Sequence, residues 1–594
     1  MANTDRSSLD DPRQAALAGR LTRRELLSRA AAFGLGASSL AAFLAACGAT
    51  ATPNIGTSPT NTTPPAAANP TATAATTGAA GAATAPTTAS PRAASPAVAA
   101  PTTAASGGNR VPAPAGKRDL TIAQGADITQ LNPQLSTSAN DTNVSFNLYD
   151  NLLYRDGEGK LQPMLATEYK ALDDTTWEFK LRQGVKFHNG DPFTSADVTF
   201  TAERAVDPEA KTLVASVYAT VAAVEAPDEF TVRFKTKAPD PLLPARLAFY
   251  GGQIMPKKYF EQTGADGFNQ KPVGAGPLQF VEWVKDDRVV LEAYKDYWGG
   301  AIAVDRVTFR PRKETAARIS SLLSGEADIA LSVPPDQIEQ INRSGKARVE
   351  SALYAGLYVL GVNSKVPPLG KPEIKQALAH AVDRKTIIDT IWRGQGSIPS
   401  GMIPKGSFAF DERLPPLPYD PAKARELLRA GGYANEEILI ESTQGYIEND
   451  RQMAEAILQM WKDAGVNARV EIIEISVRAQ KNREKSFRGL FWSDPTDTTA
   501  DPAGMSWRLL GPGGIQDYWR DARWDELGAE ANATLDQEKR KRNYDEMNRI
   551  FLTHFPWIPV IQPNQAYGIA NYVEWRPYSS TYFNLRKENL KLVR

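Results

Sequence analysis

The sequence predicts a mixed fold, α/β or α+β, in which helices and strands alternate along most of the chain. Two patterns support this prediction. Some segments have apolar residues at every second position, as half-buried strands do, and others have them three and four positions apart, as helices do. Glycine, proline and asparagine turn signals separate the two kinds of segment. The alternation begins near Asp119, and no internal repeat accompanies it.

The first predicted elements follow one another closely. Residues 119–124 alternate as a strand, residues 143–153 have the apolar spacing of a helix, and residues 177–181 alternate as a second strand. Thr194 and Asp197 have the spacing of a capping box, in which each side chain accepts a hydrogen bond from the other's backbone. We therefore expect a helix to begin directly after Thr194.

Later segments continue the alternation. Helices are predicted at residues 314–323, 373–392, 420–430 and 451–464, and strands at residues 327–331 and 468–475. The third of these helices has the clearest boundaries. Asp420 suits the N-cap, Pro421 suits the first helical position, and the pair Gly431-Gly432 is a C-terminal stop signal.

The composition excludes several classes of function. Lysine and arginine number 68, as do aspartate and glutamate, so no basic face for nucleic acid is expected. A single cysteine excludes an intramolecular disulfide and a cysteine-rich metal centre. The three histidines, His188, His380 and His554, form no close pair. We expect neither a metal nor a cofactor.

The chain also lacks the local signatures of catalysis. It has no GxSxG elbow, Walker loop, GxGxxG fingerprint or EF-hand loop. Dispersed carboxylate pairs would leave no such signature, so a secreted hydrolase remains an alternative. The absence of these signatures nevertheless disfavours an enzyme.

The first 47 residues have the features of an export signal. Arg23 and Arg24 precede the uncharged stretch 30–46, which is short for a membrane span, and small residues follow. The paired arginines resemble a twin-arginine signal. The run Leu-Ala-Ala-Cys that ends at Cys47 resembles a bacterial lipobox, whose cysteine is lipidated and becomes the mature N-terminus. The alternative is an alanine-rich anchor that happens to contain a cysteine.

Residues 48–116 predict a disordered tether. They consist almost entirely of alanine, threonine, proline, serine, glycine and asparagine, with Arg92 and Arg110 as the only charged residues before Lys117. Such a stretch cannot bury enough apolar surface to offset the entropy lost on ordering. The folded part is therefore expected to begin near Lys117.

The run WEFKLRQGVKFHNGDPFTSADV at residues 177–198 resembles the signature of the family 5 extracellular solute-binding proteins, the peptide and nickel receptors of ABC importers. Further segments resemble that family in the expected order, so that the resemblance covers essentially all of residues 118–590. These segments are residues 147–169, 274–283, 291–300, 323–330, 360–388, 419–433 and 461–471.

The resemblance implies a bilobal, periplasmic-binding-protein-like α/β fold of type II, in which two lobes joined by crossing segments close around a ligand by hinge motion. Lobe I would comprise residues 118–160, 286–360 and 566–594. An extra subdomain would comprise residues 161–285, and lobe II residues 361–565.

The resemblance also implies ligand contacts. In peptide receptors of this family the loop after the first strand lines the cleft, which here corresponds to Thr137, Ser138 and Ala139. Tyr358 matches an aromatic residue near the crossover between the lobes. The alternative for signature residues such as His188 is a purely structural role, in which they build a turn and its packing.

A second-lobe loop in peptide receptors carries a W-x-x-D motif whose aspartate holds the peptide's α-amino group. Here Trp492 is followed by Asp494 and Asp497, at two and five residues instead of three. Either aspartate could take that role, and the alternative is a surface turn. Trp507 and Trp519 are further candidates to line the cleft, although tryptophan is usually buried.

The function that the resemblance implies is a lipid-anchored, extracytoplasmic receptor, expected to be monomeric, that captures peptides and delivers them to ABC permease subunits. Its membrane contact would be the lipid anchor alone. Oligosaccharides and metal chelates remain alternative ligands, because one fold can host many ligands. A sensor that signals to a membrane kinase is also compatible with the sequence.

Overall fold

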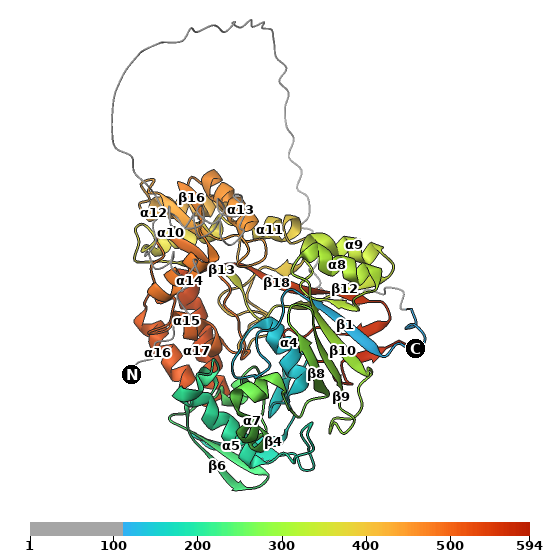
Figure 1. Ribbon diagram of the computed structural model, residues 1–594. Helices are drawn as coiled ribbons and strands as arrows, with labels where there is room; N and C mark the ends of the chain where they lie inside the picture. The colour runs from blue at the N-terminus through green and yellow to red at the C-terminus, as the bar shows by residue number, and fades with distance from the viewer. Residues whose placement is uncertain (1–110, 594) are drawn as a thin grey trace, which may run out of the picture. The chain divides into compact units, whose positions relative to one another are not determined.

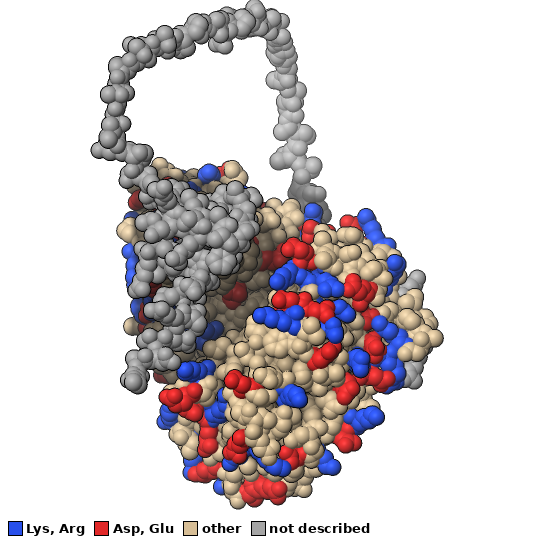
Figure 2. Space-filling view, in the orientation of Figure 1, with Lys and Arg blue, Asp and Glu red and all other residues tan. Residues whose placement is uncertain are grey.

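The computed structural model describes residues 111–593. The predicted signal, Cys47 and nearly all of the predicted tether lie outside the described residues. No helix within residues 111–593 combines the length and the apolarity that crossing a bilayer requires. On the face in view in Figure 2, basic and acidic side chains are intermingled.

A sheet of twelve strands runs through the described chain, and one long strand, β18 (Trp557–Ala570), connects its two halves (Figure 1). The first part of β18 pairs with β13 (Tyr358–Val362). Its last part pairs with β12 (Ala347–Leu353) and β11 (Ile329–Ala330). The sheet is therefore one hydrogen-bonded system with β18 at its junction.

The half of the sheet that runs from β11 to β8 contains both parallel and antiparallel strand pairs. β1 pairs in parallel with β10 and β11, and the strands that follow β10 are antiparallel. The elements of this half are β1 (Asp119–Gln124), α4 (Ala139–Leu148), β8 (Leu278–Val284), β9 (Arg288–Ala293), β10 (Arg306–Pro311), α8 (Thr315–Ser324) and α9 (Ile338–Arg343). The strands and α4, with β19 (Val573–Trp575) and β20 (Leu590–Leu592), contribute to one buried cluster, and α8 and α9 contribute to a second, smaller one.

A separate four-stranded antiparallel sheet, in the order β4-β5-β7-β6, has a hydrophobic cluster of its own. Figure 1 shows α5 and α7 beside this sheet. Its elements, with the hairpin before them, are β2 (Leu153–Arg155), β3 (Leu161–Pro163), β4 (Ala166–Asp173), β5 (Thr176–Leu181), α5 (Ser195–Val206), β6 (Val221–Asp228), β7 (Thr231–Thr236), α6 (Leu243–Arg246) and α7 (Lys257–Gln270).

The other half of the main sheet has the strand order β16-β15-β17-β13-β18. Three buried clusters fill it: one is built around Trp461 and Trp492, one around Trp524 and Trp557, and a smaller one consists of Phe487, Phe491 and Tyr518. Its remaining elements are α10 (Pro372–His380), α11 (Arg384–Thr390), β14 (Gly396–Ser397), α12 (Pro421–Ala430), β15 (Ile438–Ser442), α13 (Asp450–Asp463), β16 (Ala468–Ile472), α14 (Ile475–Glu484), β17 (Leu490–Ser493), α15 (Ser506–Leu510), α16 (Ala522–Asn532) and α17 (Gln537–His554).

Several predicted boundaries are confirmed, because local chemistry determines them. The capping box at Thr194 and Asp197 is present at the start of α5. Asp420 accepts a hydrogen bond from the Lys423 backbone at the start of α12, and Gly431 is the C-cap that follows its last residue, Ala430. The predicted strand at residues 119–124 is β1.

Other predicted elements are wrong in extent. The predicted helix at residues 143–153 is α4, which begins at Ala139 and ends at Leu148. The strands predicted at residues 327–331 and 468–475 are shorter, as β11 and β16. α14 begins at Ile475, where the second of these strands was expected to end.

The predicted helix at residues 373–392 is in fact two helices, α10 and α11. The break is stabilised locally, since Asp383 caps α11 by accepting from the Thr386 backbone. The buried Arg384 guanidinium donates to the carbonyls of Ala379, in the last turn of the first helix, and of Val382, just beyond its end. Apolar periodicity continues across this break, so the pattern alone could not reveal it.

The segment between β12 and β13 lies against the loop that follows β17. Gly356 forms an isolated bridge with Thr496, and the Asp497 backbone donates to the Ala355 carbonyl at 2.6 Å. A Cβ at position 356 would lie 2.5 Å from the Pro495 carbonyl oxygen. This close approach between backbones requires glycine.

We predict that Gly356→Ala lowers the free energy of unfolding by about 1–3 kcal/mol, because the added methyl group overpacks a backbone contact. The measurement is the thermal midpoint of the full chain. Gly125→Ala is the control, since a Cβ there would meet only a side-chain atom at 3.7 Å. Equal midpoints for Gly356→Ala and the unmodified chain would contradict this account of the crossing segment.

Candidate functional site

A cavity of about 630 Å³ lies between residues of the segment 216–250 and residues of the segment 446–532. We call it the Asp494 cavity, after the only acidic residue among the described residues that line it. Its charged lining residues are Asp494, Arg246, Arg478 and Arg508, and its aromatic ones are Phe249, Tyr250, Tyr446 and Trp507. The rest of the lining is small, aliphatic or neutral polar.

Asp494 follows directly on β17, whose four residues are all buried. Its Oδ1 accepts a hydrogen bond from the hydroxyl of Tyr446, and among the described residues no other side chain bonds its second oxygen. Burial raises the pKa of Asp494, while the Tyr446 hydrogen bond and the Arg478 charge lower it. The strand thus presents a half-buried carboxylate with one oxygen open to the cavity.

Arg478 of α14 contacts both the end of β17 and the Tyr446 side chain that bonds Asp494. Its Nε and Nη2 donate to the Trp492 carbonyl at 3.2 and 2.9 Å, and its guanidinium lies 3.3 Å from the centroid of the Tyr446 ring. Burial lowers the pKa of Arg478, and the neighbouring Tyr446 and Asp494 raise it. A guanidinium stacked on a ring is stabilised by cation–π attraction. Arg478 therefore fixes Tyr446 against Asp494.

The other carboxylates of this loop point away from the Asp494 cavity. Asp497 is 3% exposed and accepts from the Ser407 hydroxyl at 2.5 Å and from the Asp501 backbone at 2.8 Å. Its burial raises its pKa to about 6. Asp501 pairs with Arg540 at 2.8 Å and accepts from Tyr544 at 3.0 Å. Both aspartates stabilise the loop, and the cavity receives Asp494 alone.

The three candidate tryptophans lie in different surroundings. Trp507 is half-buried and lines the Asp494 cavity, with its ring 5.5 Å from that of Trp524. Trp519 lies outside the cavity, where it packs on Trp524 and His554. Trp492 is fully buried in a hydrophobic cluster. Of the three, only Trp507 is placed to meet a ligand in the cavity.

The remaining candidates do not line the cavity. Tyr358 is half-buried, with its ring 5.9 Å from that of Tyr354 and 5.7 Å from that of Trp392. Thr137, Ser138 and Ala139 are exposed at the start of α4. A ligand role for these four residues stays a prediction.

Sequence reasoning missed Tyr446, Arg478 and Arg508. Tyr446 lies 48 positions before Asp494 in a glycine-containing loop, and its partnership with Asp494 depends on tertiary contact alone. The one local signal is an aromatic residue next to Gly445 within a polar turn. Nothing in the periodicity marks the two arginines as lining residues.

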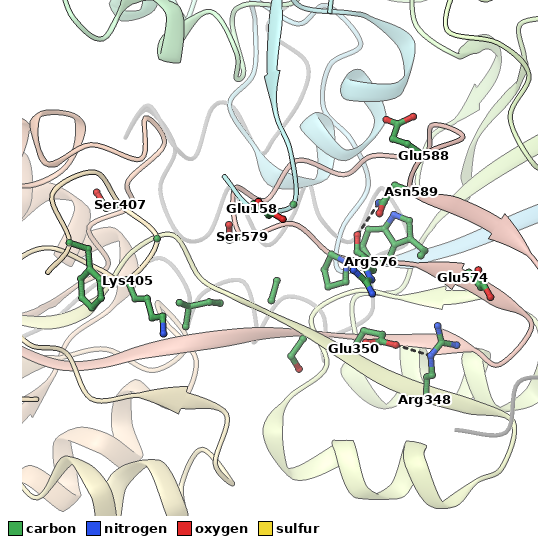
Figure 3. A pocket seen from close by; sticks show the side chains of 18 of the residues that line it. Glu158, Arg348, Glu350, Lys405, Ser407, Glu574, Arg576, Ser579, Glu588 and Asn589 are labelled. Carbon is green, nitrogen blue, oxygen red and sulfur yellow. Dashed lines mark hydrogen bonds and ion pairs between the residues drawn. The ribbon is translucent and has the colours of Figure 1, made fainter. Parts of the chain in front are cut away.

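A larger cavity, of about 1010 Å³, lies elsewhere, along β12 and the loops around residues 405–412 and 574–591 (Figure 3). Arg348 and Glu350 form an ion pair on its wall, at 2.9 Å. It contains none of the predicted ligand residues. Its size alone does not make it the better candidate site.

No group of three or more histidine, cysteine, aspartate or glutamate side chains within residues 111–593 is arranged to hold a metal ion. His188 of the signature run is buried, and burial lowers its pKa to about 4. Its Nε2 lies 3.0 Å from the Gly276 carbonyl, and its Nδ1 accepts from the Gly274 backbone at 3.2 Å. It joins two loops as a neutral imidazole.

Comparison with known proteins gives a consistent picture. Residues 160–517 match the family described as bacterial extracellular solute-binding proteins, family 5 Middle. The chain is 30% identical, over 68% of its length and 81% of the relative's, to Di/tripeptide-binding protein 1 of Pseudomonas aeruginosa. It is 28% identical to the glutathione-binding protein GsiB of Escherichia coli O157:H7, over 75% and 89% of the two chains.

Solved structures share the fold. The structure of HbpA2 from Haemophilus parasuis superimposes with a TM-score of 0.72 at 25% identity, over 80% of this chain and 99% of that one. The predicted fold class is confirmed by such neighbours, which include a peptide complex of the binding protein DppA from Helicobacter pylori.

Proposed function

The chain belongs to the family 5 bacterial extracellular solute-binding proteins, and on that premise we propose that it captures peptides outside the cytoplasm and delivers them to the permease of an ABC importer. Two relatives named for di/tripeptides and for glutathione support a peptide ligand. The family and these relatives are binding proteins of transporters, which favours binding over catalysis.

The observation that carries the peptide proposal is the open oxygen of Asp494. A carboxylate in a partly desolvated cavity suits an α-ammonium group, because a charge-assisted hydrogen bond is strong where water is excluded. Tyr446 and Arg478 hold the carboxylate in place, and Trp507 offers an apolar wall to a side chain.

We further propose that two lobes close around the ligand, with the boundaries predicted from the sequence. Separate hydrophobic clusters on either side of β18 support this division. The hinge would lie in β18 and in the segment between β12 and β13, which join the two sides through backbone hydrogen bonds.

Membrane attachment through Cys47 is also part of the proposal. The support is the arginine pair, the uncharged stretch and the Leu-Ala-Ala-Cys run, followed by a tether long enough for a receptor to reach its permease.

We predict that short peptides with a free amino terminus raise the thermal midpoint of the full chain, since a ligand that binds the folded state stabilises it. Asp494→Asn should weaken their binding about 10- to 100-fold, because a hydrogen bond to a charged group is lost. N-acetylation of the peptide should weaken binding to the unmodified chain and have little further effect on Asp494→Asn.

Asp266→Asn is the matched control, because Asp266 is an exposed aspartate of α7 that does not line the cavity. The proposal fails if oligosaccharides or metal chelates raise the midpoint and no peptide does. The role of Asp494 fails if the Asp494→Asn variant binds free and acetylated peptides as the unmodified chain does.

We predict that Cys47→Ser releases the protein from membranes without changing its peptide affinity, since the substitution removes the lipid attachment point. The measurement is the fraction of protein that sediments with membranes after expression in a bacterial host. Undiminished sedimentation of the variant would refute the anchor at Cys47.

A further inference from the structure

Arg508 is the charged lining residue of the Asp494 cavity that lacks a partner of opposite charge. It lies on α15, is exposed, and uses its Nε to donate to the Gly504 carbonyl at 2.9 Å. Within the described part of the chain, no carboxylate forms an ion pair with its guanidinium, and no protein group accepts from its two terminal nitrogens. The cavity thus contains guanidinium donors that only water or a ligand can satisfy.

Arg246, which lines the cavity from the segment 216–250, is not available in this way. Arg246 pairs with Asp240 through both terminal nitrogens, and its Nε donates to the Val217 carbonyl at 2.9 Å. Its charge is balanced and its donors are used within the protein. Arg246 therefore builds the wall of the cavity and adds little to its net charge.

The other two charged lining residues, Arg478 and Asp494, carry opposite charges that compensate each other. Arg478 stacks on the ring of Tyr446, whose hydroxyl donates to Asp494, and each of the two charges shifts the pKa of the other towards its charged form. With Arg246 neutralised by Asp240, the lining carries one positive charge in excess, on Arg508. A ligand that is enclosed here is best matched if it carries one negative charge in excess, because an unpaired charge is costly to desolvate.

We propose that the Asp494 cavity selects peptides of net negative charge, with an acidic side chain bound by Arg508 and the amino terminus bound near Asp494. The inference rests on the proposed function and adds to it a ligand class and a residue that determines specificity. A carboxylate can accept from both terminal nitrogens of a guanidinium in one plane, which makes arginine well suited to this recognition.

The test uses three tripeptides that differ only in their central residue, which gives them net charges of about −1, 0 and +1: Ala-Glu-Ala, Ala-Ala-Ala and Ala-Lys-Ala. Their dissociation constants for the full chain are measured by titration calorimetry. We expect Ala-Glu-Ala to bind about 10-fold more tightly than Ala-Ala-Ala, and Ala-Lys-Ala to bind most weakly, since a hydrogen bond between charged groups is stronger than one to a neutral group.

Arg508→Gln should abolish the preference for Ala-Glu-Ala, because it removes the extra charged contact. The dissociation constant of Ala-Ala-Ala should stay within about 3-fold of its value for the unmodified chain. Arg542→Gln is the matched control, because Arg542 is an exposed arginine on α17 outside the cavity. Arg508→Lys should retain part of the preference, since the charge stays and the planar fork is lost.

Two outcomes overturn the inference in distinguishable ways. If the three peptides bind equally well, or if Arg508→Gln keeps the preference as Arg542→Gln does, the charge selectivity is wrong while the peptide proposal stands. If none of the three peptides binds, both the selectivity and the peptide proposal fail.

Discussion

The pairing of one strand, β18, with both halves of the main sheet is the constraint on which the rest of the structure depends (Figure 1). Its register runs from Trp557 opposite Gly361 on one side to Ala570 opposite Ala347 on the other. Because strands keep their spacing through backbone hydrogen bonds, the two sides cannot separate without breaking this ladder. The proposed closure would therefore take place by bending at this junction.

The candidate site is built where this junction meets the loop after β17. Backbone bonds from Asp497 to Ala355 and from Leu357 to Pro495 hold the loop on the crossing segment. The Arg155 guanidinium of β2 donates to the Thr499 carbonyl and so holds the loop from the other side. Buried Asp497 and Asp501 fix its conformation from within. These supports leave Asp494 as the carboxylate available to the cavity, on a strand end rigid enough to orient it.

The sequence predicts what depends on neighbouring residues and misses what depends on distant ones. The starts of α5 and α12 are predicted correctly because Thr194 with Asp197, and Asp420 with Pro421, act within one helical turn. The fold class follows from the ordered segments that resemble the family. Tyr446 and Arg478 could not be predicted, since their link to Asp494 and Trp492 exists only after folding. The same holds for the inward turn of Asp497, which the Ser407 hydroxyl and Ala355 carbonyl determine.

The central claim is that a peptide in the Asp494 cavity brings the two sides together by bending at β18. Pulsed electron–electron double resonance between two spin labels can measure this closure directly. Cys47 is the only cysteine, so Cys47→Ser leaves a chain free of thiols into which two cysteines can be introduced for labelling. Spin labels at Asp266→Cys and Asp463→Cys would lie on exposed positions of α7 and α13. The account predicts that saturating Ala-Glu-Ala shortens and narrows the distance distribution between the labels. An identical distribution with and without a peptide that is shown to bind would contradict it.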